Sequence, residues 1–157
     1  MLLSIFSSEH AAVHAGFWGK VSPYLGEFRE RRLLVSFDFS DKLDAPEVEH
    51  ILPNVDYAFF SHPRPDREIE EFLGWAKARG PRIAIATLGE HGSLAYDGEH
   101  FYRHGILPVE VVDTLGAGDA FIAGFMQAVL NDRDIPNSWA QGTESAARVI
   151  TSFGAWQ

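Results

Sequence analysis

The sequence predicts an α/β protein in which helices cover both faces of a mostly parallel sheet, giving three layers. Short apolar runs, typical of strands buried on both faces, alternate with helical patterns along the chain. Such alternation predicts right-handed crossover units on an open sheet. A glycine-rich turn at residues 116–118 then opens a long apolar helix, an arrangement that suits phosphate binding in this fold class.

Four apolar runs are the expected parallel strands. Each is rich in aliphatic, aromatic or alanine residues and is bounded by polar residues, glycine or proline. The first is expected near residues 12–17, and the buried ones at 33–39, 55–60 and 82–88. Trp18 follows the first strand, where its expected role is to pack in the core, with the lining of a ligand site as the alternative.

Helix boundary signals fill the gaps between these runs. Asp44 precedes a short helix that begins with Pro46 and Glu47. Pro65-Asp66 begins a longer helix, which ends at Gly80-Pro81. These two helices are the expected crossover connections between the parallel strands.

The second half adds a hairpin, one more strand and a final helix. Strands at 93–96 and 100–102 flank the Asp97-Gly98 turn, which is a strong hairpin signal. A strand at 109–112 is expected to lead into the glycine-rich turn. The final helix is expected to open with Ser138 and Gln141, which have the spacing of a capping box.

Composition narrows the functional classes. A chain of 157 residues that is 46% hydrophobic is sufficient for one compact domain. A formal net charge of -9 gives no electrostatic case for binding nucleic acid or an anionic membrane. The absence of cysteine excludes disulfides and thiolate chemistry and fits a reducing compartment. The opening residues suggest neither a signal peptide nor a membrane helix, so a cytoplasmic location is expected.

The glycine-rich turn predicts an anion hole with a carboxylate beside it. The first N–H groups of a helix have no partner within the helix and attract anions. Gly116 and Gly118 allow close approach and unusual backbone angles, so the N–H groups of Gly116, Ala117 and Gly118 are expected to converge on one anion. Asp119 is then either a general base or an ordinary acidic residue that stabilises the helix dipole.

Two familiar phosphate motifs are excluded by the same residues. A Walker A loop requires Lys and Ser or Thr after its last glycine, where this chain has Asp119 and Ala120. A dinucleotide fingerprint requires glycine at the position of Phe121.

The string from Asp113 to Phe121 resembles the C-terminal signature of the ribokinase-like (PfkB) carbohydrate kinases. Segments 37–42, 87–93 and 121–125 resemble one branch of that family, the fructoselysine 6-kinases. The likeness runs from about His14 to the C-terminus. It implies a three-layer Rossmann-like (ribokinase-like) fold, with residues 1–157 as its C-terminal nucleotide-binding part and with the N-terminal part and the lid missing.

The resemblance implies ATP and Mg²⁺ as cofactors and a sugar as acceptor. The γ-phosphate would pass to a sugar hydroxyl, most simply the 6-hydroxyl of fructoselysine. Asp119 would be the general base, with the anion hole at 116–118 stabilising the moving phosphoryl group. Asp38 is expected to contact the sugar together with Asp119.

Four loops that follow predicted strands would gather at one rim of the sheet, at residues 38–42, 61–64, 87–92 and 114–119. By resemblance, nucleotide contacts come from Thr87, Gly89, Gly92 and Thr114. From the residues alone, the two glycines at 89 and 92 fit a plain strand-to-hairpin turn equally well.

Two segments are expected to supply metal ligands. By resemblance, Asp113 is expected to help hold a monovalent cation such as K⁺, assisted by carbonyls near residues 152–155, although it also suits a turn that bonds its own backbone. The family's Asn-x-x-Glu motif has no asparagine at residues 61–68. Glu68 or Asp66 would substitute as a Mg²⁺ ligand, or both are ordinary first-turn residues.

Two classes of function therefore remain open. One is an ATP-dependent sugar kinase, seen as a fragment or truncated form, whose acceptor is fructoselysine or another sugar such as fructose, ribose or a sugar acid. The other is a noncatalytic nucleotide-binding or assembly domain. Loss of neighbouring strands would leave an exposed sheet edge, so self-association through that edge is also expected.

Overall fold

The computed structural model describes residues 12–154. They fall into two compact units. The first unit reaches Gly89 and takes in Leu94–Arg103, and the second comprises Glu90–Ser93 and the chain from His104 onward. Each unit is described by itself below.

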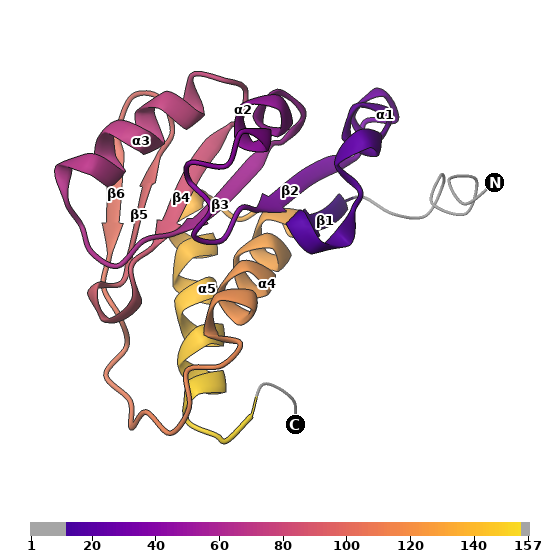
Figure 1. Cartoon of the computed structure of the whole chain (residues 1–157). Helices are drawn as coiled ribbons and strands as arrows, with labels where there is room; N and C mark the ends of the chain where they lie inside the picture. Colours follow the sequence, from indigo (N-terminus) through magenta and orange to yellow (C-terminus); the bar gives the residue numbers. More distant parts are fainter. Residues whose placement is uncertain (1–11, 155–157) are drawn as a thin grey trace. The chain divides into compact units, whose positions relative to one another are not determined.

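Six strands form one sheet in the order β1-β2-β3-β4-β5-β6 (Figure 1). The first four pair in parallel, as the alternation predicts. The strands are β1 (Ala12–Gly16), β2 (Leu34–Asp38), β3 (Tyr57–Ser61), β4 (Ile83–Thr87), β5 (Ser93–Tyr96) and β6 (Phe101–His104). The short turn between β5 and β6 makes them the expected hairpin.

Strand order does not reverse among the described strands, because each lies beside the next in sequence. A reversal of strand order, where open parallel sheets commonly bind ligands, is therefore not what locates a site among these strands. The parallel register does locate one edge: Gly16 lies opposite Asp38, and Ser61 lies opposite Thr87. The carboxyl ends of β1 to β4 consequently share that edge.

Three α-helices of the first unit connect its strands, namely α1 (Leu25–Glu30), α2 (Glu47–Ile51) and α3 (Arg67–Lys77). Asp66 caps α3 as expected, since its Oδ1 accepts a hydrogen bond from Ile69 N at 3.1 Å. Short 3₁₀ turns complete the connections, at η2 (Phe17–Gly19), η3 (Ser22–Tyr24), η4 (Leu52–Asn54) and η5 (Gly89–His91).

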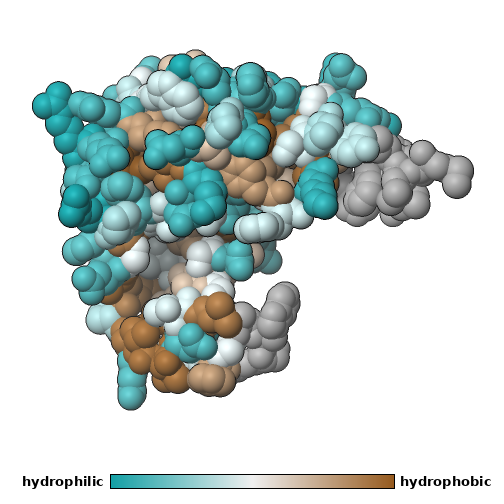
Figure 2. Space-filling model, in the orientation of Figure 1, coloured by the Kyte–Doolittle hydropathy of each residue, from teal (hydrophilic) through white to brown (hydrophobic). Residues whose placement is uncertain are grey.

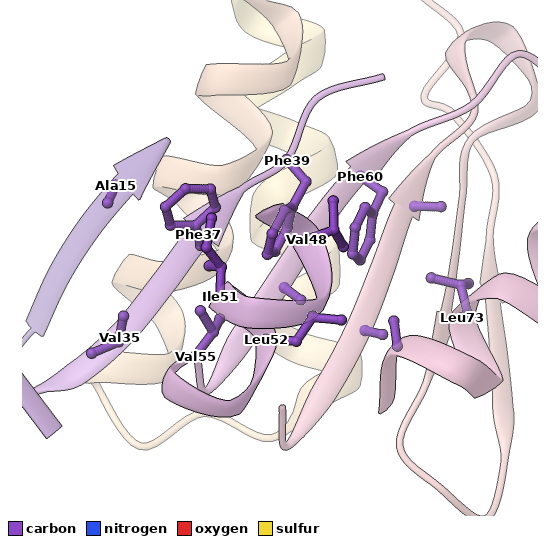
Figure 3. Close-up of a cluster of buried hydrophobic side chains, with 14 of the residues drawn as sticks. Ala15, Val35, Phe37, Phe39, Val48, Ile51, Leu52, Val55, Phe60 and Leu73 are labelled. Atoms are coloured by element: carbon purple, nitrogen blue, oxygen red, sulfur yellow. The ribbon is translucent and has the colours of Figure 1, made fainter. Parts of the chain in front are cut away.

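The core of the first unit lies between the sheet and these helices (Figure 3). Phe39 and Phe60 stack with ring centroids 4.8 Å apart, and Phe37 packs beside Phe39. Leu52 and Leu73 are fully buried against them from the helical side. This packing fixes the ends of β2 and β3, where two of the expected site loops begin.

A buried carboxylate ties the opposite ends of the same strands. Asp56, which is only 7% exposed, accepts hydrogen bonds from Val35 N at 2.9 Å and from Arg82 Nε at 3.0 Å. Both carboxylate oxygens are thereby satisfied, as burial of a charge requires.

The second unit contains α4 (Ala117–Leu130) and α5 (Ile135–Ile150), which pack closely. A Cβ added at Gly124 would lie 2.3 Å from Ser145 Oγ, and one added at Gly142 would lie 2.9 Å from Phe121 O. Glycine at these two positions therefore lets α4 and α5 approach each other closely.

Two expectations for the second unit are wrong. Residues 109–112 form no strand, because Val112 N donates to Ile150 O of α5 at 2.8 Å and makes no ladder. The final helix begins at Ile135, where Asp134 accepts from Asn137 N at 2.9 Å. Ser138 is buried inside this helix and does not begin it.

The segment that replaces the expected strand is apolar and exposed. Figure 2 shows hydrophobic residues gathered at the lower end of the view, where the connection from β6 to α4 lies. Its large exposed side chains are Ile106, Leu107, Val109, Val111, Val112 and Leu115. Among the described helices, none combines the length and the hydropathy that crossing a bilayer requires.

Candidate active site

Three of the four expected loops meet at the carboxyl edge of the first unit's sheet. Backbone hydrogen bonds link them directly: Ser61 N donates to Ser40 O at 2.8 Å, and His62 N donates to Thr87 O at 3.0 Å. The loops after β2, β3 and β4 therefore form one connected rim. The fourth loop, at residues 114–119, belongs to the second unit, and its place at the same rim stays a prediction.

Asp38 ends β2 at this rim. Its Oδ1 accepts a hydrogen bond from Ser40 N at 2.7 Å, which closes a tight turn with Ser40 at a φ of 54°. Asp38 is partly exposed. Its predicted contact with the sugar stays a prediction.

Thr87 and Gly89 lie where β4 ends. Thr87 Oγ1 donates to Phe60 O at 3.3 Å, so the hydroxyl supports the rim. Gly89 has a φ of 57°, and a Cβ placed there would meet nothing within 4 Å. The left-handed backbone favours glycine at this position, and the open space beside it would admit a ligand.

Gly92 has a different structural reason to be glycine. Its φ is 83°, and an added Cβ would lie 2.1 Å from His104 O and 2.9 Å from Gly105 Cα. Close approach of two backbone segments thus requires the missing side chain. This supports the turn interpretation of Gly92, and its contact with a nucleotide stays a prediction.

The start of α4 is built by a left-handed glycine. Gly116, with a φ of 81°, is the residue that precedes the first helical residue, Ala117. Ala117 N donates to Thr114 O at 3.2 Å, and Ala120 N donates to Gly116 O at 2.9 Å. The N–H of Ala117, one of three predicted to bind the anion, thus already has an acceptor.

Gly118 and Asp119 lie in the first turn of α4. No hydrogen bond is recorded for the N–H groups of Gly116, Gly118 and Asp119 in the part of the chain that the structure describes. A Cβ at Gly118 would meet nothing within 4 Å, so protein packing does not require glycine there. Asp119 is exposed. The helix start therefore offers donors and a carboxylate to a ligand.

Asp113 braces the loop that leads into α4. Its Oδ1 accepts from Leu115 N at 3.0 Å and its Oδ2 from Gly154 N at 3.1 Å. The hydrogen bond from Leu115 N, and then that from Gly154 N, lowers the pKa of Asp113 below its usual value. The structure bears out the turn interpretation and brings Asp113 to the C-terminal segment. The role in binding K⁺ stays a prediction, and Ala155 lies outside the described residues.

Glu68 lies in the one group of potential metal ligands recognised among the described residues, with His62 and Asp66. Their ligand atoms all lie within 4.8 Å of one another. Arg64 Nε donates to Asp66 at 2.8 Å, and His62 Nε2 lies 3.3 Å from it. The hydrogen bond from Arg64, then that from Ile69 N, lowers the pKa of Asp66 to about 2.

This cluster includes a residue that sequence reasoning did not single out. His62 directly follows β3, in a loop already expected at the rim, and that position beside the acidic start of the next helix is the signal that would have identified it. Trp18 departs from expectation as well, since core packing was one prediction and 93% of the residue is exposed.

Comparison with known proteins identifies sequence relatives of this chain. The chain is 41% identical over 149 residues to fructoselysine 6-kinases of Shigella flexneri and of Escherichia coli, covering 95% of this chain and 57% of theirs. It is 32% identical over 152 residues to fructosamine kinase FrlD of Bacillus subtilis, covering 96% of this chain and 53% of that protein. The chain thus spans a little more than half the length of these curated relatives.

Solved structures agree on the fold. A ribokinase from Thermotoga maritima matches 99% of this chain and 55% of its own with a TM-score of 0.79 at 21% identity. A microbiome-derived acarbose kinase matches 94% of this chain and 51% of its own with a TM-score of 0.84 at 22% identity. The fold is therefore ribokinase-like.

The sequence of the chain also matches a family model. The model of the pfkB family carbohydrate kinases matches residues 34–157, which include both the rim of the first unit and the start of α4. The chain belongs to the pfkB family of carbohydrate kinases.

Proposed function

We propose that the protein is an ATP-dependent kinase that phosphorylates the 6-hydroxyl of a fructosamine, most simply fructoselysine. The observation that carries the proposal is the start of α4: a left-handed Gly116, donor N–H groups and an exposed Asp119, within a chain 41% identical to fructoselysine 6-kinases. The aligned region covers 95% of the chain.

Phosphoryl transfer asks for positioning, charge stabilisation and a base. The acceptor oxygen forms a bond to the γ-phosphorus while the bond from that phosphorus to the leaving ADP oxygen breaks. Asp119 receives the proton of the acceptor hydroxyl. The N–H groups of Gly116 and Gly118 donate to the phosphoryl oxygens as charge shifts among them. Because Ala117 N bonds to Thr114 O, its part in the anion hole requires that turn to open.

The proposed nucleotide contacts come from the turn after β4 and, separately, from the loop before α4. Gly89 has a left-handed backbone and open space beside it, which suits close approach of phosphate groups. The backbone of Gly92 packs on His104, and Thr87 donates a hydrogen bond to Phe60 O; both contacts support the turn. Thr114 is exposed and leads into the anion hole. Asp38, at the neighbouring strand end, is the proposed acceptor-side carboxylate.

Glu68 is the residue here that best suits the Mg²⁺ ion that such kinases need. Mg²⁺ is held by oxygen ligands and commonly keeps several waters beside one or two carboxylates and the substrate phosphates. Glu68 is exposed, whereas Asp66 already binds Arg64 and the N–H of Ile69. Glu68 would hold Mg²⁺ together with the nucleotide, and the ion would neutralise phosphate charge. Asp113, whose carboxylate braces the loop before α4 through Leu115 N and Gly154 N, would hold K⁺.

The test is an acceptor panel with the protein as its own gene encodes it. ADP release would be followed with fructoselysine, fructose, ribose and a sugar acid at matched concentrations. The proposal expects the highest kcat/KM for fructoselysine. Turnover that favours ribose or a sugar acid would support the kinase activity but contradict fructoselysine as the acceptor. Binding of ATP without turnover of any of these sugars would favour a noncatalytic nucleotide-binding domain.

A further inference from the structure

A buried polar cluster anchors part of the proposed ATP turn to helix α5. Trp139, at 2% exposure, donates from Nε1 to Ser93 Oγ, and Ser93 itself is 4% exposed. Both belong to the second unit, to which Glu90–Ser93 is assigned although the residues on either side of it belong to the first. This hydrogen bond therefore ties one end of the turn to a helix 46 positions away in the sequence.

His104, the last residue of β6, stacks on the same indole. The imidazole lies parallel to Trp139, with ring centroids 6.2 Å apart and an interplanar angle of 17°. His104 Nδ1 lies 3.0 Å from Gly105 O, which can only accept, so Nδ1 carries the proton. Thr143, one turn after Trp139, lies 3.4 Å from the same nitrogen. The orientation of the imidazole over the indole is thereby fixed.

Gly92 connects this cluster to the turn itself. Its backbone approaches His104 so closely that an added Cβ would lie 2.1 Å from His104 O. The conformation of Gly92, with a φ of 83°, thus depends on where His104 lies, and the orientation of His104 depends on Trp139. Gly92 and Ser93 are consequently held from two sides, by backbone packing and by a side-chain hydrogen bond.

Helix α5 also fixes the helix that carries the proposed base. Gly142, one turn after Trp139, packs on Phe121 of α4, and Ser145 packs on Gly124. Phe121 lies two residues after Asp119. Helix α5 therefore positions both the end of the turn, at Gly92 and Ser93, and the start of α4, and all of these residues belong to the same compact unit.

From this geometry we infer that Trp139 is a positioning residue for ATP: through Ser93 and His104 it holds the turn that ends at Gly92 in the conformation that receives the nucleotide phosphates. The inference rests on the proposed function for the identity of the ligand. It assigns Trp139 no contact with ATP, since the side chain is buried.

The test measures ATP binding by calorimetry, without any acceptor sugar, in the protein as its own gene encodes it. Trp139→Phe keeps an aromatic ring and removes the donor, and Ser93→Ala removes the acceptor. Each is expected to raise the Kd for ATP between about threefold and tenfold. The double variant is expected to bind ATP no more weakly than the weaker single variant, because both changes remove the same hydrogen bond.

Ser138→Ala is the matched control. Ser138 is fully buried on the same helix beside Trp139, but its hydroxyl donates to Arg133 O at 3.4 Å and not to the turn. This variant is expected to bind ATP as the wild type does, whatever its stability. Equal ATP affinity in the wild type, Trp139→Phe and Ser93→Ala would overturn the inference and leave the cluster a purely structural feature.

A second measurement needs no folded variant at position 139. The indole N–H resonance of Trp139 in the wild-type protein is expected to shift as ATP is added, with the Kd found by calorimetry. It can be assigned by removing the other tryptophans one at a time. An unmoved resonance at ATP saturation would contradict the inference.

The same measurements separate the inference from the proposed function. ATP binding that depends on Trp139, in a protein that phosphorylates no sugar, would overturn the proposed function alone. Failure of the wild type to bind ATP would overturn both.

Discussion

Asp113 Oδ2 accepts a hydrogen bond from Gly154 N at 3.1 Å, joining two residues that are 41 positions apart. Its other oxygen accepts from Leu115 N. One carboxylate therefore braces the loop that enters the proposed anion hole against the segment that follows α5. The loop at residues 114–116 begins from this support.

Asp113→Asn tests the brace. The variant can still accept through its amide oxygen but loses one of two charged acceptors, so we expect faster hydrogen exchange at the amides of Leu115 and Gly154. Exchange measured by NMR at pH 7 would show this, with Asp132→Asn as an exposed control. Unchanged exchange at both amides would show that the brace does not depend on the charge. If Asp113 also holds a cation, the variant should lose any activation by K⁺.

Acid should weaken the cap of α3. The pKa of Asp66 is lowered from 3.8 to about 2 by the hydrogen bond from Arg64 and then that from Ile69 N. A carboxylate with a lowered folded pKa stabilises the fold above its unfolded pKa, and this contribution disappears as pH falls through the folded pKa. We expect the wild type to lose it between about pH 4 and pH 2, measured by the urea midpoint of unfolding.

Two variants separate the parts of that contribution. Asp66→Asn keeps a capping oxygen and loses the ion pair with Arg64, whereas Asp66→Ala loses both. We expect the alanine variant to have the lower melting temperature at pH 7. Both variants should show a smaller change in stability between pH 4 and 2 than the wild type, with the remainder coming from carboxylates such as Asp97, whose pKa is also lowered to about 2. A change in stability between pH 4 and 2 that is as large in Asp66→Ala as in the wild type would show that Asp66 contributes nothing to it.

The two glycines of the anion hole should respond differently to alanine. Gly116 has a φ of 81°, which strains any residue with a Cβ, so Gly116→Ala should lose about 1 to 2 kcal/mol of stability. Gly118 is helical with open space around it, so Gly118→Ala should gain roughly 0.5 to 1 kcal/mol. Thermal unfolding would measure both. Gly118→Ala should nevertheless weaken ATP binding, because its methyl group would occupy the space proposed for phosphate.

The contact between α4 and α5 should not tolerate a methyl group. Gly124→Ala would place its Cβ 2.3 Å from Ser145 Oγ and 2.7 Å from Gln141 O. We expect a loss of about 1 to 3 kcal/mol in the free energy of unfolding. Gly74→Ala is the matched control, since Gly74 lies within α3 and has nothing within 4 Å of an added Cβ. That variant should be as stable as the wild type or more so, and equal effects at the two glycines would refute the account of the helix contact.

The sequence predicts the first unit well because its local signals agree with its tertiary packing. The apolar run at 82–88 is confirmed as β4, and Asp66 caps α3 as its position before the helix indicates. These runs are short and strongly apolar, and parallel strands buried on both faces require that pattern. The convergence of the loops after β2, β3 and β4 follows directly from parallel pairing.

The failures arise where contacts between distant residues decide the structure. Val112 resembles part of a strand, yet its N–H bonds to Ile150 of α5. Ser138 and Gln141 match a capping box, but Asp134 provides a cap four residues earlier, followed by Pro136 in the first turn. The reason for glycine at position 92 is the backbone of His104, which spacing in the sequence does not indicate. Gly116, by contrast, could be predicted because its left-handed angle is a local requirement.

The central claim is that Asp119 accepts the proton of a sugar hydroxyl as phosphate is transferred. The most direct measurement is the rate of γ-phosphate transfer to fructoselysine by the wild type and by Asp119→Asn, with ATP affinity measured in both. We predict that kcat falls by about 10² to 10⁴ while the Kd for ATP stays within a few-fold of the wild-type value. Equal turnover by Asp119→Asn would contradict the account.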